Sequence, residues 1–414
     1  MAKDFIMFDL RKKMKKLLLG LSLAFFLIFT ANYATAQSDS AQAKSEVKAE
    51  QKAEPEKFNP GPFIIDHVID HYGWHITGEG DKSVTIPLPV ILVEHWKPTV
   101  FMSSKFGHEP HYQAYNGYTI GFTEETEGKI VKLAGEYANY TGAMHEIIEA
   151  EGIQAGDNAA AAKLIDADAT KAIYDISITK NVCSLLISII ILLWLFLAVA
   201  KQYKKREGMA PHGAQGLVEP LILYIRDEIA IPSLGEKRYL KYFPYLLTLF
   251  FFIFVNNLMG LIPIFPGGAN VTGNIAITGI LAVITFFITS FSADKNYWKH
   301  LINTPGVPWF LKFPIPLMPI VEIIGIFTKP FVLMVRLFAN ITAGHIIALG
   351  VVALIFIFGG MAPALGYGVS IVSLVFYVFM GLLEVIVAFI QAFVFTLLTA
   401  LFTGMAMGED HAEA

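Results

Sequence analysis

The 414-residue sequence has only one cysteine, Cys183, and comparatively few charged residues. A single cysteine excludes a disulfide framework and any metal site that needs several cysteines. Charged residues make up 16% of the chain and hydrophobic residues 55%, whereas soluble domains average about 25% charged residues. The formal net charge is −4, so no basic surface argues for a nucleic-acid partner. These deficits predict an integral membrane protein that binds no nucleic acid.

The first 36 residues have the pattern of a secretory signal peptide. A basic stretch at 11–16 precedes an apolar run at 17–29, and the small residues Ala34 and Ala36 follow. The apolar run is shorter than the ~20 residues that span a bilayer, which favours cleavage after Ala36 over a first membrane anchor. Residues 37–61 contain almost no large apolar side chain and are expected to form a flexible charged linker.

Residues 62–180 have the composition of a soluble domain, and we expect a mixed α/β extracytoplasmic segment of unknown role. Strand-like runs occupy 83–93 and 118–131, and helix-like runs occupy 136–150 and 158–174. Proline donates no hydrogen bond to a strand ladder. The first run is therefore expected at the edge of a sheet, because Pro87 and Pro89 interrupt it and Pro98 follows it.

Histidines in this segment raise the alternative of a metal site. On a helix, His67, His71 and His75 would share one face at the spacing of metal ligands. However, Gly73 interrupts such a helix, and no second histidine pair has zinc-like spacing. Solvated or locally bonded histidines are the favoured interpretation, and the sequence predicts no metal and no other cofactor.

Five long apolar segments follow and predict an all-α membrane domain over 181–408, with a cytoplasmic tail at 409–414. The basic residues at 201–206 place the end of the first span in the cytoplasm by the positive-inside rule, and residues 212–235 look like an amphipathic segment at that face. The last two segments exceed 40 residues, about 60 Å of helix, whereas the hydrocarbon core is ~30 Å thick. They are expected to form a long, strongly tilted helical hairpin. The five segments lie at 183–200, 242–262, 273–291, 317–358 and 365–407.

The final hairpin carries only four formal charges: Glu322, Lys329, Arg336 and Glu384. An arginine at bilayer depth costs at least about 2.5 kcal/mol and cannot avoid this cost by losing its charge. Snorkelling from a helix end and an ion pair with Glu322 or Glu384 are the structural alternatives for Arg336. A fixed positive charge that faces an ionisable partner in another subunit is the more economical interpretation.

Helical geometry at 100° per residue sorts the polar side chains of the hairpin. Glu322, Lys329 and Arg336 form one stripe with Asn340 a turn further on, whereas His345 lies about 180° from Arg336. On the next helix a second stripe repeats every seven residues. Because intramembrane polar residues usually face a cavity or each other, these stripes indicate a lined aqueous path, with interhelical hydrogen bonding as the alternative for Asn340 and Gln391. The second stripe consists of Ser370, Tyr377, Glu384 and Gln391.

Several of these segments resemble the motifs of subunit a of the F-type ATP synthase, the membrane stator of a rotary motor. Residues 329–345 resemble the family signature that contains the arginine, and residues 391–395 look like the second signature on the last helix. Residues 256–263 and 270–272 resemble motifs on earlier helices. The similarity extends from about residue 217 to 407 and is specific, because the arginine, asparagine and glutamine occur at the family's spacing within one hairpin.

The resemblance implies a role for each position that matches. Arg336 would face the carboxylate of each passing ring subunit, with Asn340 and Gln391 as polar neighbours. His345 and Glu384 would line the extracytoplasmic half-channel; they exchange the glutamate and histidine of the common bacterial pattern, as in mitochondrial members. Secondary candidates are Glu322, Lys329, Tyr377 and Ser370.

The resemblance also implies the partners and the location of the chain. Expected partners are a ring of small helical-hairpin c-type subunits, the b-type subunits of the peripheral stalk, the rest of the ATP synthase and the lipid bilayer. The expected location is the bacterial inner membrane, with the mature N-terminus extracytoplasmic and the C-terminus cytoplasmic. No Gly-rich phosphate loop is present, so a non-catalytic subunit is predicted. A secondary ion-coupled transporter is the alternative, although its usual inverted repeat is not apparent; a purely structural anchor would leave the intramembrane charges unexplained.

Overall fold

The computed structural model describes most of the chain beyond residue 60. The expected signal peptide, nearly all of the expected linker and the C-terminal tail lie outside the described residues. Of residues 317–319 only the backbone is described. The described residues are 60–61, 64, 68–77, 84–108, 111–123, 126, 128–153, 157–205, 209–262, 265, 267–295, 297–298 and 317–408.

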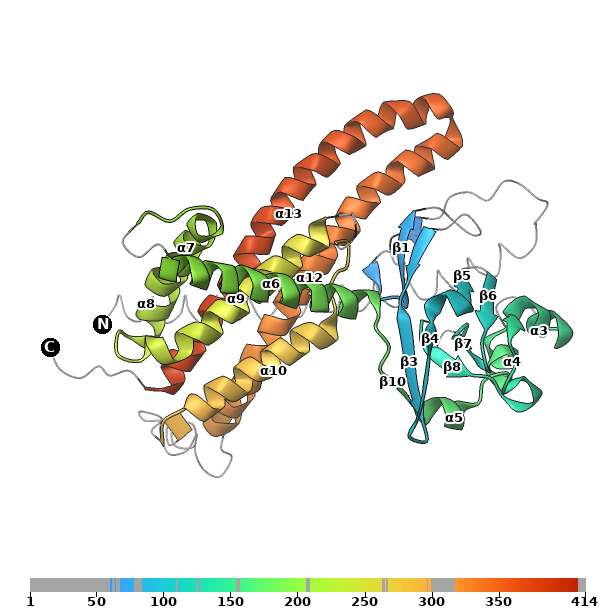
Figure 1. The fold of residues 1–414 in the computed structure, drawn as a ribbon, viewed down its shortest axis with the longest axis horizontal. Helices are drawn as coiled ribbons and strands as arrows, with labels where there is room; N and C mark the ends of the chain where they lie inside the picture. The colour runs from blue at the N-terminus through green and yellow to red at the C-terminus, as the bar shows by residue number, and fades with distance from the viewer. Residues whose placement is uncertain are drawn as a thin grey trace, which may run out of the picture. The chain divides into compact units, whose positions relative to one another are not determined.

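In the part of the chain that the structure describes, five helices are long and apolar enough to cross a membrane, and they correspond to the five predicted spans (Figure 1). Each follows from an uninterrupted apolar run, because a helix satisfies its own backbone hydrogen bonds in lipid. Most of the residues in these runs remain accessible within the chain, as expected for surfaces that face lipid or partner subunits. The helices are α6 (Lys180–Lys205), α9 (Tyr239–Leu261), α10 (Ile275–Ser292), α12 (Leu317–Met361) and α13 (Pro363–Ala406).

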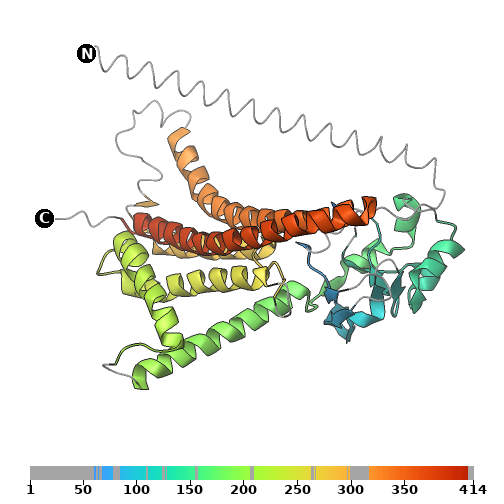
Figure 2. The ribbon, with the colours of Figure 1, turned by 90° about the horizontal axis from the view of Figure 1, so that it is seen from above.

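Helices α12 and α13 form the expected hairpin and lie side by side in both views (Figures 1 and 2). They contain 45 and 44 residues, about 66 Å each at 1.5 Å per residue. Such helices fit a ~30 Å hydrocarbon core only when strongly tilted. Helix α12 curves in its first half (Figure 2), where Pro330 removes one backbone hydrogen bond without ending the helix.

The core of the membrane domain lies where α13 crosses α9 and α12. Phe250 and Ile253 of α9 are fully buried there, and Leu333 and Leu337 of α12 are 1% exposed. In contrast, apolar side chains on the outer face of α6 are largely exposed, among them Trp194 at 68%. This pattern fixes one face of each helix inside the domain and leaves the other for lipid or partners.

The expected amphipathic segment is helical throughout. It consists of α7 (Ala214–Tyr224), the π-helical turn η5 (Ile225–Ala230) and α8 (Ile231–Leu234). Its apolar side chains join the core, whereas Arg226 and Asp227 form an exposed ion pair at 2.7 Å. The end of α8 packs tightly on α13, because a Cβ at Gly404 would lie 2.0 Å from the Ser233 carbonyl oxygen.

The segment before the first membrane helix, residues 62–180, folds into short antiparallel sheets and small helices where it is described, as expected for a mixed α/β segment. The prediction of an edge strand for 83–93 was wrong: β3 (Pro89–Glu94) is the central strand between β10 (Ile173–Asp175) and β4 (Lys97–Met102). Pro89 is the first residue of the strand, where its missing N–H interrupts no ladder. The preceding strand, β2 (Val84–Pro87), pairs only with β1 (Gly73–Thr77).

The other expected runs of this segment are divided into shorter elements. The run at 118–131 is two paired strands, β7 (Tyr118–Ile120) and β8 (Ile130–Lys132). Only the end of 136–150 is α-helical, as α3 (Met144–Ala150), and 158–174 contains α4 (Asn158–Lys163) and α5 (Ala167–Lys171) before β10. The remaining elements are η3 (Ser103–Phe106), β5 (Gly107–His108), β6 (His111–Ala114), η4 (Gly135–Tyr137) and β9 (Gly142–Ala143).

The helix that would have placed the histidines on one face is not formed by the described residues. His71 precedes β1, and His75 lies within that strand, while His67 is outside the described residues. Across the described part of the chain, no group of three His, Cys, Asp or Glu side chains is arranged to hold a metal ion.

Candidate functional site

The register of the hairpin decides which residues of α12 and α13 face each other. A Cβ at Gly366 would lie 2.7 Å from the Gly359 Cα, and a Cβ at Gly344 would lie 2.8 Å from the Glu384 carboxylate. The two helices are antiparallel. A position eight residues before Gly344 on α12 therefore lies opposite the position eight residues after Glu384 on α13. Arg336 is therefore level with about residue 392 of α13, next to Gln391.

Arg336 and Asn340 are exposed on the outside of the hairpin. Arg336 forms no salt bridge or hydrogen bond with any described residue, which leaves neither Glu322 nor Glu384 as its intrachain partner. An unpaired arginine in an apolar surround is costly. Its position thus points to a counter-charge supplied from outside this chain.

His345 and Glu384 lie on the inside of the hairpin, about 14 Å along α12 from the level of Arg336. A Cβ at Gly260 of α9 would be 3.5 Å from His345 Nε2. The Glu384 carboxylate occupies the space that a side chain at Gly344 would fill. Glycine at these two positions therefore makes room for the imidazole and the carboxylate within a closely packed helix interface.

Several buried polar atoms lie on His345 and Glu384 or within one helical turn or one residue of the groups that approach them, and we call them the inner polar cluster. His345 Nε2 and Glu384 Oε1 are buried without a hydrogen bond of good geometry to a described residue. Buried polar groups are nearly always satisfied by protein or by ordered water. Ordered water bound beside them would satisfy these atoms. The other members are Asn256 Oδ1, Asn270 Nδ2 and Thr342 Oγ1.

A buried asparagine ties the elements around the inner polar cluster together. Asn257 of α9 accepts a hydrogen bond from the Thr272 hydroxyl at 2.6 Å and donates one to the Ala388 carbonyl at 3.3 Å. These bonds join α9, the loop before α10 and α13. Sequence reasoning assigned no role to the asparagines of α9 or of this loop; their signal was an amide side chain within an otherwise apolar run.

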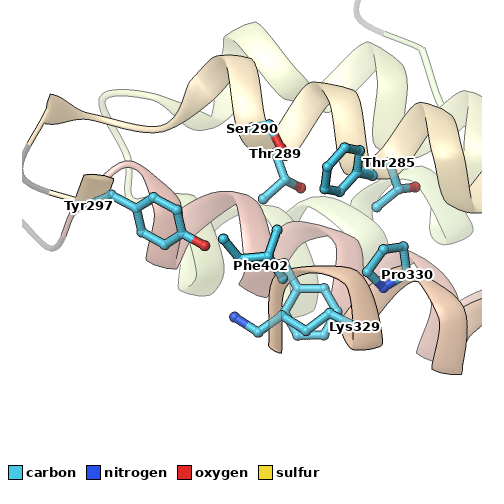
Figure 3. Close-up of a pocket in the computed structure, with 9 residues that line it drawn as sticks. Thr285, Thr289, Ser290, Tyr297, Lys329, Pro330 and Phe402 are labelled. Atoms are coloured by element: carbon cyan, nitrogen blue, oxygen red, sulfur yellow. The ribbon is translucent and has the colours of Figure 1, made fainter. Parts of the chain in front are cut away.

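A second polar site lies between α10, the first part of α12 and the last turns of α13 (Figure 3). It surrounds a cavity of about 20 Å³, which is enough for one water molecule. Lys329 closes one side, with its ammonium group 5.2 Å from the centre of the Phe402 ring. The polar side chains that line this cavity are Thr285, Thr289, Ser290, Tyr297 and Lys329.

The remaining candidates are distributed along the same two helices. Gln391 is only 7% exposed; Glu322 is half-buried and lies within electrostatic range of Tyr297. Tyr377 is half-buried, and the Ser370 hydroxyl donates to the Tyr367 carbonyl. The structure therefore brings His345 and Glu384 into one region and Glu322 and Lys329 into another, and places Ser370 outside both.

The fold and the site define a multi-pass helical membrane protein with an exposed arginine between two internal polar regions. The family of ATP synthase A chains matches residues 182–404, more than half of the sequence. The chain belongs to this family, whose members are non-catalytic membrane subunits of the ATP synthase.

Curated relatives agree with this assignment. The chain is 44% identical to ATP synthase subunit a of Chloroherpeton thalassium over 248 residues, 58% of this chain and 70% of the relative. It is 46% identical to ATP synthase subunit a 2 of Prosthecochloris aestuarii, over 58% of this chain and 72% of the relative. It is 40% identical to ATP synthase subunit a of Myxococcus xanthus, over 58% of this chain and 79% of the relative.

The segment before the first membrane helix has a separate match. Residues 63–166 are similar to a domain of unknown function, DUF8433. That match carries no activity, so the role of the segment has to be argued from its contacts.

Proposed function

We propose that this chain is the stator subunit that carries protons across the membrane in an F-type ATP synthase, with two half-channels separated by Arg336. One observation carries the proposal: Arg336 is exposed without a partner among the described residues, while His345 and Glu384 are directed into the domain on the other side of the hairpin. A structural anchor would need neither the exposed charge nor the inner polar cluster.

The inner polar cluster is the proposed inlet. Protons pass along water molecules held by its unpartnered atoms, with the Glu384 carboxylate and the His345 imidazole as proton carriers. A proton delivered to a carboxylate on the ring of c-type subunits neutralises it. The neutral group can then turn into lipid without the cost of a buried charge.

Arg336 acts at the point where the ring carboxylate returns to the stator. Its guanidinium is always charged and favours the ionised form of a nearby carboxylate, so the proton is released on the far side. The same fixed charge repels a positive carrier that would otherwise pass directly from one half-channel to the other. Gln391, which lies at this level of the hairpin, is a buried neighbour of the passage.

The polar site around Lys329 is the proposed outlet. It lies about 10 Å from the level of Arg336 along α12, on the opposite side from His345. Its cavity has room for one water molecule next to Tyr297 and Thr289. Glu322, seven residues or about two helical turns further out on the same stripe, provides a carboxylate at the exit.

Charge distribution supports the orientation. The basic residues Lys201, Lys204 and Lys205 end α6, which places that end in the cytoplasm and the exported segment outside. The chain then lies in the bacterial inner membrane with a cytoplasmic C-terminus. The b-type subunits of the peripheral stalk are the proposed partners that hold it against the rotating ring.

A cross-linking experiment tests the proposed ring contact. In a Cys183→Ala background, Asn340→Cys is paired with single cysteines along the ring subunit's helix. A disulfide between the two subunits is expected, because Asn340 shares the exposed face of Arg336. Ala348→Cys, at a position that is 8% exposed, is the control that should not react. Equal yields at both positions would refute the proposed interface.

The coupling ion is tested by ATP-driven pumping in inverted vesicles over a range of pH and sodium concentration. Wild type is compared with the double exchange His345→Glu, Glu384→His. Protons as the coupling ion predict retained pumping in the exchange variant and no response to sodium. If pumping by the exchange variant were lost and added sodium alone restored it, the proton assignment would be wrong.

A further inference from the structure

The exported segment is attached directly to the first turn of α6. Asp70 accepts a hydrogen bond from the Asn181 backbone N–H at 2.9 Å and another from the Thr179 hydroxyl at 2.7 Å. The Lys180 N–H donates to the His71 carbonyl at 2.9 Å. The first N–H groups of a helix have no partner within the helix, so residues 70–71 cap α6 and fix the position of its first turn.

A tryptophan of the same segment holds the loop between α9 and α10. Trp74 is 3% exposed, and its ring meets Phe265 edge to face with centroids 5.0 Å apart. It also packs with Ala269 and Val271, both fully buried, in one apolar cluster that includes Cys183 of α6. Aromatic pairs of this kind contribute beyond the area that they bury.

The loop held by Trp74 borders the inner polar cluster. A Cβ at Gly260 would lie 3.4 Å from the Ala269 carbonyl and 3.5 Å from His345 Nε2, so the loop backbone and the imidazole approach the same spot. Asn270, between the two residues that pack on Trp74, has a buried Nδ2 without a partner among the described residues. The packing around Trp74 therefore fixes atoms at the inlet.

The first turn of α6 adds buried polar atoms beside this loop. Asn181 is 2% exposed and Ser184 is fully buried, yet Asn181 Oδ1 and Ser184 Oγ have no hydrogen-bond partner in the described part of the chain. Lys180, at the same turn, lies within electrostatic range of His345. Polar atoms in this arrangement fit bound water molecules.

We propose that Asp70 and Trp74 of the exported segment are positioning residues of the proton inlet, and that they hold a hydrated mouth formed by Asn181, Ser184 and Asn270 next to His345. This inference rests on the proposed function and gives the exported segment a role in it. Asp70 orients the α6 side of the mouth, and Trp74 orients the loop side. Loss of either contact lets one wall move relative to His345.

Aqueous access to the mouth is tested in the assembled synthase with a single cysteine. Ser184→Cys is placed in a Cys183→Ala background and treated from the extracytoplasmic side with a small charged thiol reagent. Modification and a block of ATP-driven pumping are expected. Leu193→Cys, at a position 59% exposed on the apolar face of α6, should stay unmodified. An unreactive cysteine at 184 would overturn the proposed mouth.

The positioning role is tested with paired substitutions in the same complex. Trp74→Ala and Asp70→Ala are expected to lower pumping per assembled complex by about tenfold and to change the labelling rate at 184. Trp74→Phe keeps an aromatic ring and Asp70→Asn keeps one acceptor oxygen, so both should retain near-normal values. Unchanged pumping and labelling in the alanine variants would overturn the inference.

Failure of this inference is distinguishable from failure of the proposed function. If the alanine variants behave as wild type while Arg336→Ala abolishes synthesis, the positioning role is refuted and the stator function stands. If Arg336→Ala pumps normally, the proposed function is refuted whatever the reactivity at position 184.

Discussion

The contact between Gly344 and Glu384 predicts a substitution that separates folding from function. In Gly344→Ala the new methyl carbon would lie 2.8 Å from Glu384 Oε1, and 3.4 and 3.5 Å from the Cδ and Cγ atoms. The carboxylate must therefore move away. Because it is the end of a flexible side chain, the steric cost is expected at the low end of the ~1–3 kcal/mol typical of overpacking.

The helix itself offsets part of that cost. Alanine is favoured over glycine in a helix interior by about 1 kcal/mol, so α12 and the assembled complex should persist. The displaced carboxylate, in contrast, leaves its place in the inlet, and a shift of about 1 Å can reduce a rate by a factor of 10 to 100. We expect normal amounts of complex with ATP-driven pumping reduced about tenfold or more.

The assay is proton pumping in inverted vesicles, normalised to the amount of assembled synthase. Gly381→Ala is the control, because Gly381 lies one turn from Glu384 on α13 and a Cβ there meets nothing within 4 Å. It should pump as wild type. Normal pumping by Gly344→Ala, with the complex intact, would refute the role assigned to the Glu384 carboxylate.

Three further predictions concern stability. Asn257→Ala breaks two buried hydrogen bonds and should destabilise the membrane domain by about 2–4 kcal/mol, measured as heat-induced loss of assembled subunit; an unchanged midpoint would contradict it. Gly404→Ala places a carbon against the Ser233 carbonyl, which no side-chain rotation relieves, and should reduce the yield of subunit far more than Gly381→Ala does; equal yields would argue against this packing. Hydrogen bonds from Lys132 and Tyr118 lower the pKa of Glu94. The ionised Glu94 carboxylate therefore stabilises the fold fully above the ordinary carboxyl pKa of about 4.3. This stabilisation is lost as the pH falls through the lowered pKa. After correction for intrinsic exchange, hydrogen exchange of β3 should accelerate over that pH range in wild type and stay constant in Glu94→Gln. The same pH profile in both proteins would refute the contribution of ionised Glu94 to stability.

The sequence was sufficient to predict the five long helices, because the length of an apolar run sets a membrane span locally. Helical geometry also sufficed to assign Arg336 and His345 to different sides of α12. Whether Pro330 would end α12 or lie within it could not be decided from the local sequence, since neighbouring packing decides how a proline is accommodated.

Contacts between residues far apart in the chain could not be predicted from the sequence. The buried amides of Asn181 and Asn270 matter only because α6 and the α9–α10 loop meet beside His345, and no periodicity within one segment encodes that meeting. Likewise, Pro89 was expected to mark an edge strand, whereas its position at the first residue of β3 allows pairing on both sides. No sequence pattern indicated that Asp70 and Trp74 attach the segment before α6 to the membrane domain.

ATP synthesis by energised vesicles that carry Arg336→Ala tests the central claim most directly. The account predicts a fully assembled synthase that makes no ATP, because the only exposed cation without an intrachain partner in the middle of the described hairpin would be gone. Synthesis at the wild-type rate by the same assembled complex would contradict it.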